Sequence, residues 1–264
     1  MYCSNDALLH LINRIITIIF NNLKSERLAI MMKFKKVMLS FALLSLFGFS
    51  WPFSWLFSHP NNEVMGTAAW LNKEVQIIES QANNIDPTVL RLGLKAYLNA
   101  HQRGLDSKQI LTVIDYSKPS TEKRLWVFDL KHNRTLYNTW VSHGKNSGGI
   151  NATSFSNADG SLKSSLGLFL TEEPYMGGNG YSLRLRGLEA GVNDHAYERS
   201  VVVHGAWYVN PDTIRRYGQI GRSWGCPAVD ERLAKPLINT IKENTLVFAY
   251  YPDRKWLSHS NFLA

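Results

Sequence analysis

Three consecutive valines, Val201 to Val203, run directly into His204 and limit what this chain can fold into more than any other stretch. β-Branched side chains are stiff and pack well on a pleated surface, so the run predicts a buried strand. Such a strand presents the histidine at its edge with little freedom. Cys226 follows in a stretch that contains Gly221 and Gly225, and these glycines predict a tight turn whose backbone approaches the thiol closely.

A thiol beside an imidazole is a candidate nucleophile, because the base takes the proton and the thiolate attacks. The competing interpretation is an inert buried cysteine and a histidine satisfied in the core, which is the commoner situation for isolated residues. The flanking glycines, the hydroxyl of Ser223 and the order of strand and turn favour the catalytic interpretation. We therefore predict Cys226 as the nucleophile and His204 as its general base.

Composition is that of a globular protein with a modest basic excess. The chain has 264 residues, of which 45% are hydrophobic, so it can form one sizeable domain with additions. Its formal charge is +8, and residues 1–58 contribute +4 of it through six basic and two acidic side chains. The remainder is mildly basic, which favours an anionic surface or polymer as partner. No nucleic-acid-binding motif is present in the sequence, so we expect no nucleic acid partner.

Cysteine usage narrows the chemistry further. The chain contains only Cys3 and Cys226, and Cys3 lies in the leader described next. A disulfide within the folded part and a cysteine-rich metal site are therefore excluded. Asp194, His195 and Glu198 lie close together but lack the spacing of a known ligand motif, so we interpret them as a solvated loop. Nothing in the sequence implies a metal or another cofactor.

Residues 1–58 have the features of a leader. A short basic segment precedes an apolar run over 37–49, which is typical of an export signal. We expect translation to start at Met31 or Met32. Because apolar residues continue beyond the run, an uncleaved membrane anchor over 37–57 is the alternative. Both interpretations predict a domain in the periplasm or cell envelope.

Residues 59–108 are predicted to form a pair of helices packed on the following domain. Apolar side chains recur at spacings of three and four over 62–82. Asp86 and Pro87 supply an N-cap and a favoured first residue for the second helix, which should end near Gln102.

From Ile110 onward the pattern is that of strands. The predicted strands cover residues 110–116, 125–130, 135–141, 166–171, 181–186, 200–204 and 245–251. A helix is predicted over 230–243, with a kink at Pro236. We therefore expect a mainly β domain over 109–255, either a β-sandwich or an open barrel with flanking helices, followed by a tail over 256–264.

Several separated motifs together carry a family resemblance. The histidine precedes the cysteine, His204 is followed by Gly205, and Ser223-Trp224-Gly225-Cys226 forms the turn. With the upstream stretches at 141–144 and 165–169, this order is similar to the L,D-transpeptidase (YkuD-type) catalytic domain, in the branch of murein L,D-transpeptidase catalytic domain proteins. The resemblance covers about residues 64–253.

The resemblance implies a reaction on peptidoglycan stem peptides. Attack at the bond between the L-centre of diaminopimelate and the terminal D-alanine would release D-alanine and leave a thioester on Cys226. A neighbouring amine, or water, would then resolve the thioester. The turn residues Ser223, Trp224 and Gly225 are then candidates for the oxyanion site or for orienting the turn, and a backbone carbonyl is expected to orient the imidazole.

Other residues are weaker candidates for contacts with substrate. Many members of the family carry an arginine two residues after the cysteine, where this chain has Ala228. Arg222 is a candidate to replace it, and so are Arg184 and Arg186. The remaining weak candidates for substrate binding are Gly205, His143 at a strand end and Tyr181 on a half-exposed strand.

Two rival functions remain open at this point. A sortase-like transpeptidase also uses a histidine and then a cysteine on a β-barrel, but it favours a longer gap and a downstream arginine on a strand, for which Arg254 is poorly placed. A catalytically inactive module that binds peptidoglycan is the second rival. The presence of both Cys226 and His204 speaks against it.

Overall fold

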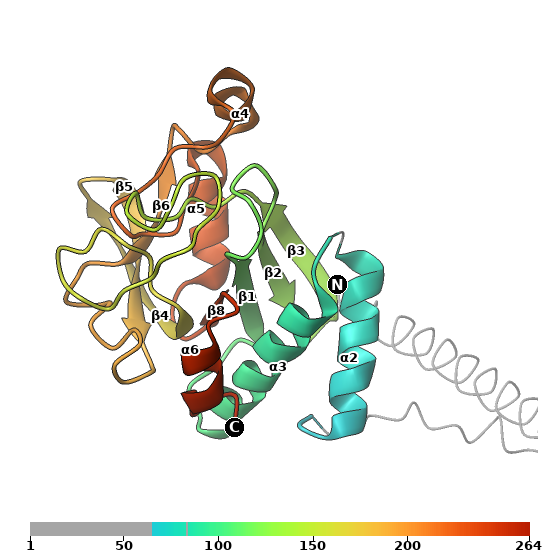
Figure 1. Ribbon diagram of the computed structural model, residues 1–264. Coiled ribbons are helices and arrows are strands. Elements are labelled where there is room, and N and C mark those ends of the chain that lie inside the picture. The colour runs from blue at the N-terminus through green and yellow to red at the C-terminus, as the bar shows by residue number, and fades with distance from the viewer. Residues whose placement is uncertain (1–64, 83) are drawn as a thin grey trace, which may run out of the picture. The chain divides into compact units, whose positions relative to one another are not determined.

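The computed structural model describes residues 65–82 and 84–264, and the predicted leader lies outside them. Glu63–Ala264 forms one compact unit. The described residues contain a single eight-stranded sheet with the order β3-β2-β1-β8-β4-β5-β6-β7 (Figure 1). The strands are β1 Ile110–Asp115, β2 Leu125–Asp129, β3 Arg134–Thr139, β4 Gly167–Gly177, β5 Gly180–Gly187, β6 Val202–Ala206, β7 Ala228–Asp230 and β8 Leu246–Tyr250.

The sheet is mixed and its two outer strands are β3 and β7. β1 runs parallel to β8, β6 runs parallel to β7, and the other neighbouring strands are antiparallel. The predicted mainly β fold with flanking helices is confirmed, and the single sheet matches the open-barrel alternative. The sheet centre is apolar on both faces, because every residue of β1, β2 and β8 is buried.

Two helices precede the sheet, as the sequence predicts. α2 (Ala68–Gln81) begins later than expected, because the Thr67 side chain caps it by accepting a hydrogen bond from the Trp70 N–H. α3 (Pro87–Gln102) begins where predicted, and Asp86 accepts from the first N–H groups. Gly93 lets α3 approach the sheet closely, since a Cβ there would lie 3.2 Å from Val113 and 3.3 Å from Phe248.

A third helix, α5 (Glu231–Ile241), covers the other end of the sheet next to β5 and β6 (Figure 1). It continues through Pro236 and buries a stripe of apolar residues that includes Leu237 and Ile238. The position of α5 determines which face of β6 packs against a helix. A Cβ on Gly205 would lie 3.0 Å from both Ala234 and Glu231, so Gly205 faces α5.

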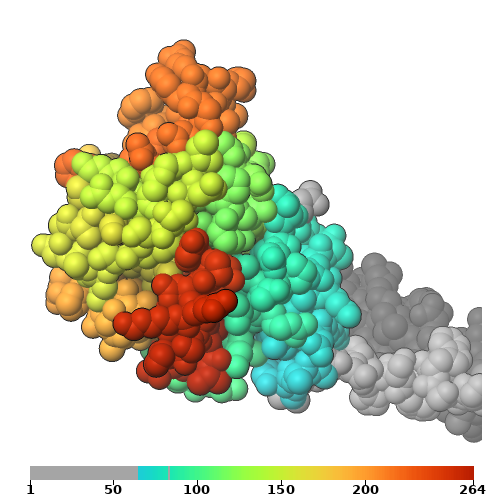
Figure 2. Space-filling view, in the orientation of Figure 1, coloured from blue at the N-terminus to red at the C-terminus, as the bar shows by residue number. Residues whose placement is uncertain are grey.

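Three short elements were not predicted from the sequence. β7 has three residues, too few for a periodic pattern. α4 (Pro211–Tyr217) is capped by Asn210 and ends at Gly218, which is left-handed. In the chain, α4 lies between β6 and β7, and in space it projects from the surface (Figure 2). Its start, Asn210 followed by Pro211, is the same kind of signal as the Asp86-Pro87 pair that identified α3, so this helix could have been predicted.

The last element, α6 (Arg254–His259), overlaps the predicted tail. Trp256 and Phe262 are buried in the main core, and the Trp256 indole donates to Glu189 at 3.0 Å. Residues 256–264 therefore contribute to packing. No helix among the described residues combines the length and apolarity needed to cross a membrane.

Candidate active site

His204 lies on β6, and Cys226 lies in the bend directly before the neighbouring strand β7. β6 and β7 pair in parallel with His204 opposite Ala228, and Cys226 comes two residues before that partner. The Val202 N–H donates to Cys226 Sγ at 3.5 Å, and the thiol donates to the Ser200 carbonyl at 3.6 Å. The sulfur is thus fixed beside the beginning of β6, while the histidine lies two residues further along the same strand.

The two faces of β6 separate the catalytic candidates from the helix. Side chains alternate along a strand, so His204 faces away from α5, which Gly205 contacts. The predicted role of Gly205 in substrate binding is therefore wrong, since it packs against the helix. His204 is opposite Ser182 on β5, so Tyr181 faces α5 as well, and its hydroxyl donates to Asn239 on that helix at 2.8 Å.

The His204 imidazole is held in one tautomer. Its Nδ1 is 2.8 Å from the Gly205 carbonyl oxygen, as expected for an imidazole oriented by a backbone carbonyl. A carbonyl only accepts, so Nδ1 carries the proton and Nε2 keeps its lone pair. Desolvation by burial lowers the pKa of His204, although the Gly205 carbonyl opposes this. The ring is therefore neutral at pH 7 and suited to accept a proton.

The thiol needs such a base. Burial raises the pKa of the Cys226 thiol, while the Val202 N–H and the charge of Arg199 lower it. Because the effect of burial is the largest, the resting form at neutral pH is mainly the thiol. A neutral imidazole and a protonated thiol form a proton-transfer pair in which the base must act before the sulfur can attack.

Ser223 orients the turn that carries Cys226. Its hydroxyl donates to the Cys226 carbonyl at 2.6 Å and accepts from the Gly225 N–H at 3.1 Å. These contacts agree with the predicted role of Ser223 in orienting the turn. The Gly225 N–H is used in this way, so it is not free for an oxyanion. The Trp224 N–H makes no hydrogen bond within the described part of the chain, whereas the Cys226 N–H interacts with its own sulfur.

Gly225 is required by the turn itself. Its φ is +129°, and a Cβ there would lie 2.8 Å from the Lys163 carbonyl oxygen. We expect Gly225→Ala to destabilise the protein by roughly 1–3 kcal/mol through backbone strain and to displace the thiol. Urea unfolding measures the first effect and alkylation of Cys226 the second. Gly160→Ala is a matched control, because Gly160 also has positive φ but nothing lies within 4 Å of its Cβ position. Equal losses in the two variants would contradict the close-approach argument.

His143 does not line the site. It is fully buried, Arg124 donates to its Nδ1 at 2.8 Å, and its Nε2 is 3.4 Å from the Gly148 carbonyl oxygen. The prediction that it contacts substrate is therefore wrong. Arg124 is also fully buried and donates to the Val141 carbonyl at 2.9 Å. This pair supports the strand end and the loop after it from inside.

His143 should make stability depend on pH. Burial and the nearby Arg124 charge lower the pKa of His143 from 6.5 to about 4. Only the unfolded state then takes up a proton between these values, so stability is full above pH 6.5 and falls as the pH drops towards 4. The full difference is about 3 kcal/mol. Urea unfolding from pH 7 to 4 should show this loss in the wild type and a smaller one in His143→Gln. Parallel curves would contradict it.

The predicted arginines are engaged elsewhere. Arg222 donates to the Gly148 carbonyl at 3.0 Å, so it fastens the loop after His143. Arg184 pairs with Glu173, and Arg186 pairs with Glu172 at 2.6 Å. Both ion pairs join β4 and β5, and Arg184 is opposite Val202, whose N–H donates to Cys226 Sγ.

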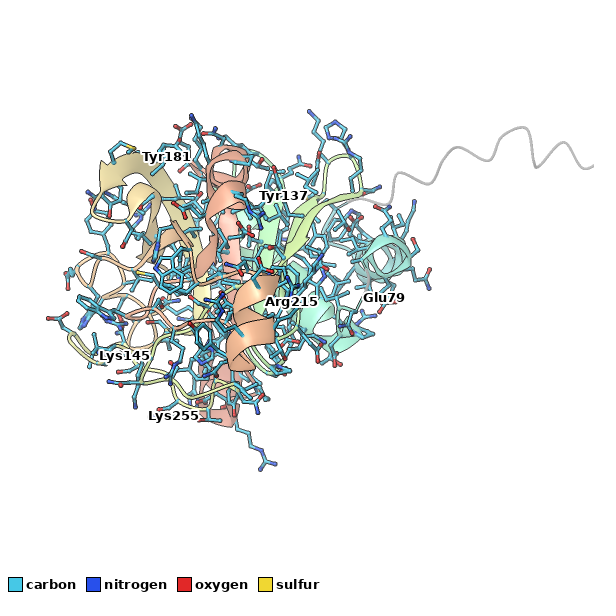
Figure 3. All side chains as sticks on the ribbon, turned by 90° about the horizontal axis from the view of Figure 1, so that it is seen from above. Glu79, Tyr137, Lys145, Tyr181, Arg215 and Lys255 are labelled. Carbon is cyan, nitrogen blue, oxygen red and sulfur yellow. The ribbon has the colours of Figure 1, made fainter. Side chains whose placement is uncertain are left out.

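Trp224 is the predicted turn residue that faces solvent. Its side chain is 75% exposed, and the Lys145 ammonium lies 5.8 Å from its ring centre. The Lys145 N–H donates to the Ser223 carbonyl at 2.8 Å, which places this pair at the cysteine turn. Tyr181 lies far from Lys145 in Figure 3, in agreement with its contact to α5. Trp224, unlike Tyr181, is placed to meet a ligand at the thiol.

The acidic loop residues make ordinary contacts. Asp194 accepts from the Asn157 amide at 2.7 Å and from the Gly191 N–H at 2.9 Å. No group of three or more histidine, cysteine or acidic side chains in residues 65–82 and 84–264 could hold a metal ion. A cavity of about 560 Å³ opens beside α6, between Phe155, Leu166 and Trp256, and neither Cys226 nor His204 lines it.

Sequence reasoning missed the residues that support the turn from below. The Ser164 hydroxyl donates to the Gly225 carbonyl at 3.1 Å, and the Ser164 N–H donates to Ser147 at 2.9 Å. Arg199, just before β6, donates to the same loop at the Lys163 carbonyl, 2.9 Å away. No local motif marks these residues. The one available signal was an arginine, Arg199, three positions before the buried valine strand begins.

Comparison with known proteins gives the family. The model of the L,D-transpeptidase catalytic domain family matches residues 81–250, more than half of the chain. A comparison with curated proteins returns no match.

Solved structures of L,D-transpeptidases are also similar at low identity. The Mycobacterium smegmatis enzyme is 14% identical with a TM-score of 0.33, over 54% of this chain and 59% of that chain. The Stackebrandtia nassauensis enzyme is 11% identical with a TM-score of 0.34, over 70% of this chain and 92% of that one. The chain thus covers less than two thirds of the mycobacterial protein. On the strength of the match over 81–250, the chain belongs to the L,D-transpeptidase catalytic domain family.

Proposed function

We propose that this protein is a cysteine L,D-transpeptidase that acts on peptidoglycan stem peptides through a thioester acyl-enzyme. The observation that carries the proposal is the pairing of β6 with β7. It holds the Cys226 sulfur against the Val202 N–H and places on the same strand a His204 whose tautomer leaves Nε2 free. Family membership supplies the reaction class.

In the first half-reaction, Nε2 of His204 takes the proton of the Cys226 thiol. The thiolate attacks the carbonyl carbon between the L-centre of diaminopimelate and the terminal D-alanine. The carbon–nitrogen bond breaks, the imidazolium returns its proton to the leaving amine, and D-alanine departs. The carbonyl oxygen carries negative charge in between, and the Trp224 N–H is a donor available for it.

In the second half-reaction, an amine or a water molecule attacks the thioester and the thiolate leaves. An amine of a neighbouring stem peptide gives a cross-link, whereas water gives L,D-carboxypeptidase activity. The neutral imidazole serves again as base for the attacking group. The predicted export signal or anchor, which lies outside the described residues, would place the domain in the periplasm or cell envelope with this substrate.

The test uses the purified full chain and a disaccharide-tetrapeptide, with mass spectrometry of both protein and products. The proposal expects released D-alanine, a cross-linked or trimmed product, and a transient mass increase on the peptide that contains Cys226. A carbapenem should also add one covalent mass there. Folded protein that gives neither product nor adduct would contradict the proposal in favour of a peptidoglycan-binding module. Labelling by a sorting-signal peptide instead would point to a sortase.

A further inference from the structure

Arg199 occupies an unusual position directly before the strand that carries His204. Its guanidinium donates four hydrogen bonds into the loop over 154–165, and all four acceptors are uncharged. They are the Ser156 carbonyl at 2.8 Å, the Ser165 hydroxyl at 2.6 Å, the Ser161 hydroxyl at 3.1 Å and the Lys163 carbonyl at 2.9 Å. One side chain therefore fixes the loop at several points, in a fork geometry that lysine lacks.

The loop that Arg199 fixes is the floor of the cysteine turn. A Cβ on Gly225 would lie 2.8 Å from the Lys163 carbonyl oxygen and 3.7 Å from Arg199 Nη2. The guanidinium and one of its acceptors thus both lie against the residue before Cys226. Ser200, the residue after Arg199, has a φ of +55°, and its carbonyl accepts a hydrogen bond from the Cys226 thiol at 3.6 Å. Arg199 and the sulfur are thus both held next to residues 200 and 225.

The positive charge of Arg199 has no ion-pair partner among residues 65–82 and 84–264, as no carboxylate there lies within 4.0 Å of it. Its side chain is partly buried, which weakens screening by water. An arginine stays charged in proteins. A charge that is held near the sulfur without a counter-ion favours any negative charge that forms there.

We propose that Arg199 is a positioning residue for Cys226, which fixes the floor of the cysteine turn and supplies the positive charge that stabilises the thiolate. This inference rests on the proposed function only in treating Cys226 as the nucleophile. The electrostatic effect on the pKa values agrees with the geometry, because the charge of Arg199 lowers the pKa of Cys226.

Other titratable groups interact electrostatically with Cys226 or with Arg199. Burial raises the pKa values of Tyr116 and Tyr208, and the charge of a Cys226 thiolate raises them further, so both phenols stay neutral at pH 7. Burial lowers the pKa of Arg199, and the negative charge of Asp159, exposed on the 154–165 loop, opposes this. His204 lies two residues beyond Val202. Only Arg199 among these is a fixed cation at every working pH.

The experiment measures the rate of iodoacetamide alkylation of Cys226 in the full chain from pH 5 to 10. Mass spectrometry of the Cys226 peptide separates it from Cys3. Arg199→Gln should raise the midpoint of the pH profile by about one unit and slow alkylation at pH 7 about tenfold. Arg199→Lys should recover most of the midpoint, since it keeps the charge, but not the thermal stability that the four hydrogen bonds provide.

Two further variants keep the outcome interpretable. Arg134→Gln removes an equal charge on β3, at the opposite edge of the sheet from β7, and should leave the profile unchanged. Asp159→Asn changes an exposed residue and should lower the midpoint, because it leaves the charge of Arg199 less neutralised. Asp159→Asn therefore tests the charge even if Arg199→Gln does not fold.

An unchanged midpoint in folded Arg199→Gln, or no downward shift in Asp159→Asn, would overturn the inference. Either result would leave the proposed function intact, because turnover of the tetrapeptide is measured separately. Conversely, a wild-type protein that does not turn over the tetrapeptide would contradict the proposed function, but the alkylation profiles would still test this inference.

Discussion

Replacing Cys226 with alanine is expected to abolish turnover of a disaccharide-tetrapeptide, with a loss of at least about 10⁴-fold in kcat. The reason is that no second thiol lies in the part of the chain that the structure describes, so nothing replaces the sulfur as nucleophile. The side chain is only partly buried, and its loss removes two weak contacts, with Ser200 and Val202. The fold should therefore survive, with thermal unfolding close to that of the wild type.

The matched control for this experiment is Cys226→Ser, which keeps the size of the side chain and a hydroxyl in place of the thiol. A hydroxyl ionises far less readily than a thiol, so this variant should also fail to turn over substrate and to bind a carbapenem covalently. Release of D-alanine by folded Cys226→Ala at a rate near that of the wild type would eliminate the acyl-enzyme mechanism.

Replacing His204 with glutamine is expected to lower kcat/KM about 10²–10⁴-fold at pH 7. The thiol then has no base, and burial keeps the pKa of Cys226 raised, so little thiolate forms. Alkylation of Cys226 at pH 7 should slow with it, which separates a loss of proton transfer from a loss of substrate binding. Ser182→Ala, opposite His204 on β5, is the matched control for packing at this position, and the activity should change little.

The pH dependence of the activity shows whether His204 acts as a base in its neutral form. Burial lowers the pKa of His204, so the wild-type base stays neutral at pH 7 and loses activity only as the pH falls through this depressed value. In His204→Gln the acid limb should move to higher pH, because the thiol, whose pKa burial raises, must then ionise without the imidazole. The gap from the wild type should therefore narrow in alkaline solution. A variant with an unchanged acid limb would show that another group is the base.

Much of the fold was predictable because local patterns agree with it. The valine run before His204 forms β6, the Asp86-Pro87 pair starts α3, and the alternating or apolar runs after Ile110 form strands. Each rests on short-range physics, namely side-chain stiffness, capping and periodic burial. β7 was missed because three residues cannot show a period, and they form a strand only through the partner that β6 provides.

The sequence identified the two residues that we propose to react, Cys226 and His204, but only part of what surrounds them. Ser223 and Gly225 were identified by the turn chemistry of their own segment. His143, Tyr181 and Gly205 were misassigned, because a sequence does not state which face of a strand meets a helix or which histidine is buried beside an arginine. Arg199 was missed for the same reason, since its role depends on a loop more than thirty residues away.

The sequence by itself pointed to the proposed nucleophile, the proposed base and the turn directly before Cys226, because these depend on residue types and on backbone conformations that nearby glycines and β-branched residues impose. The tertiary structure decided which side chains share a face with His204, which N–H groups remain free near Cys226 and which cation supports the turn. Those features depend on strand register and on the packing of distant loops, and such contacts leave no periodic trace along the chain.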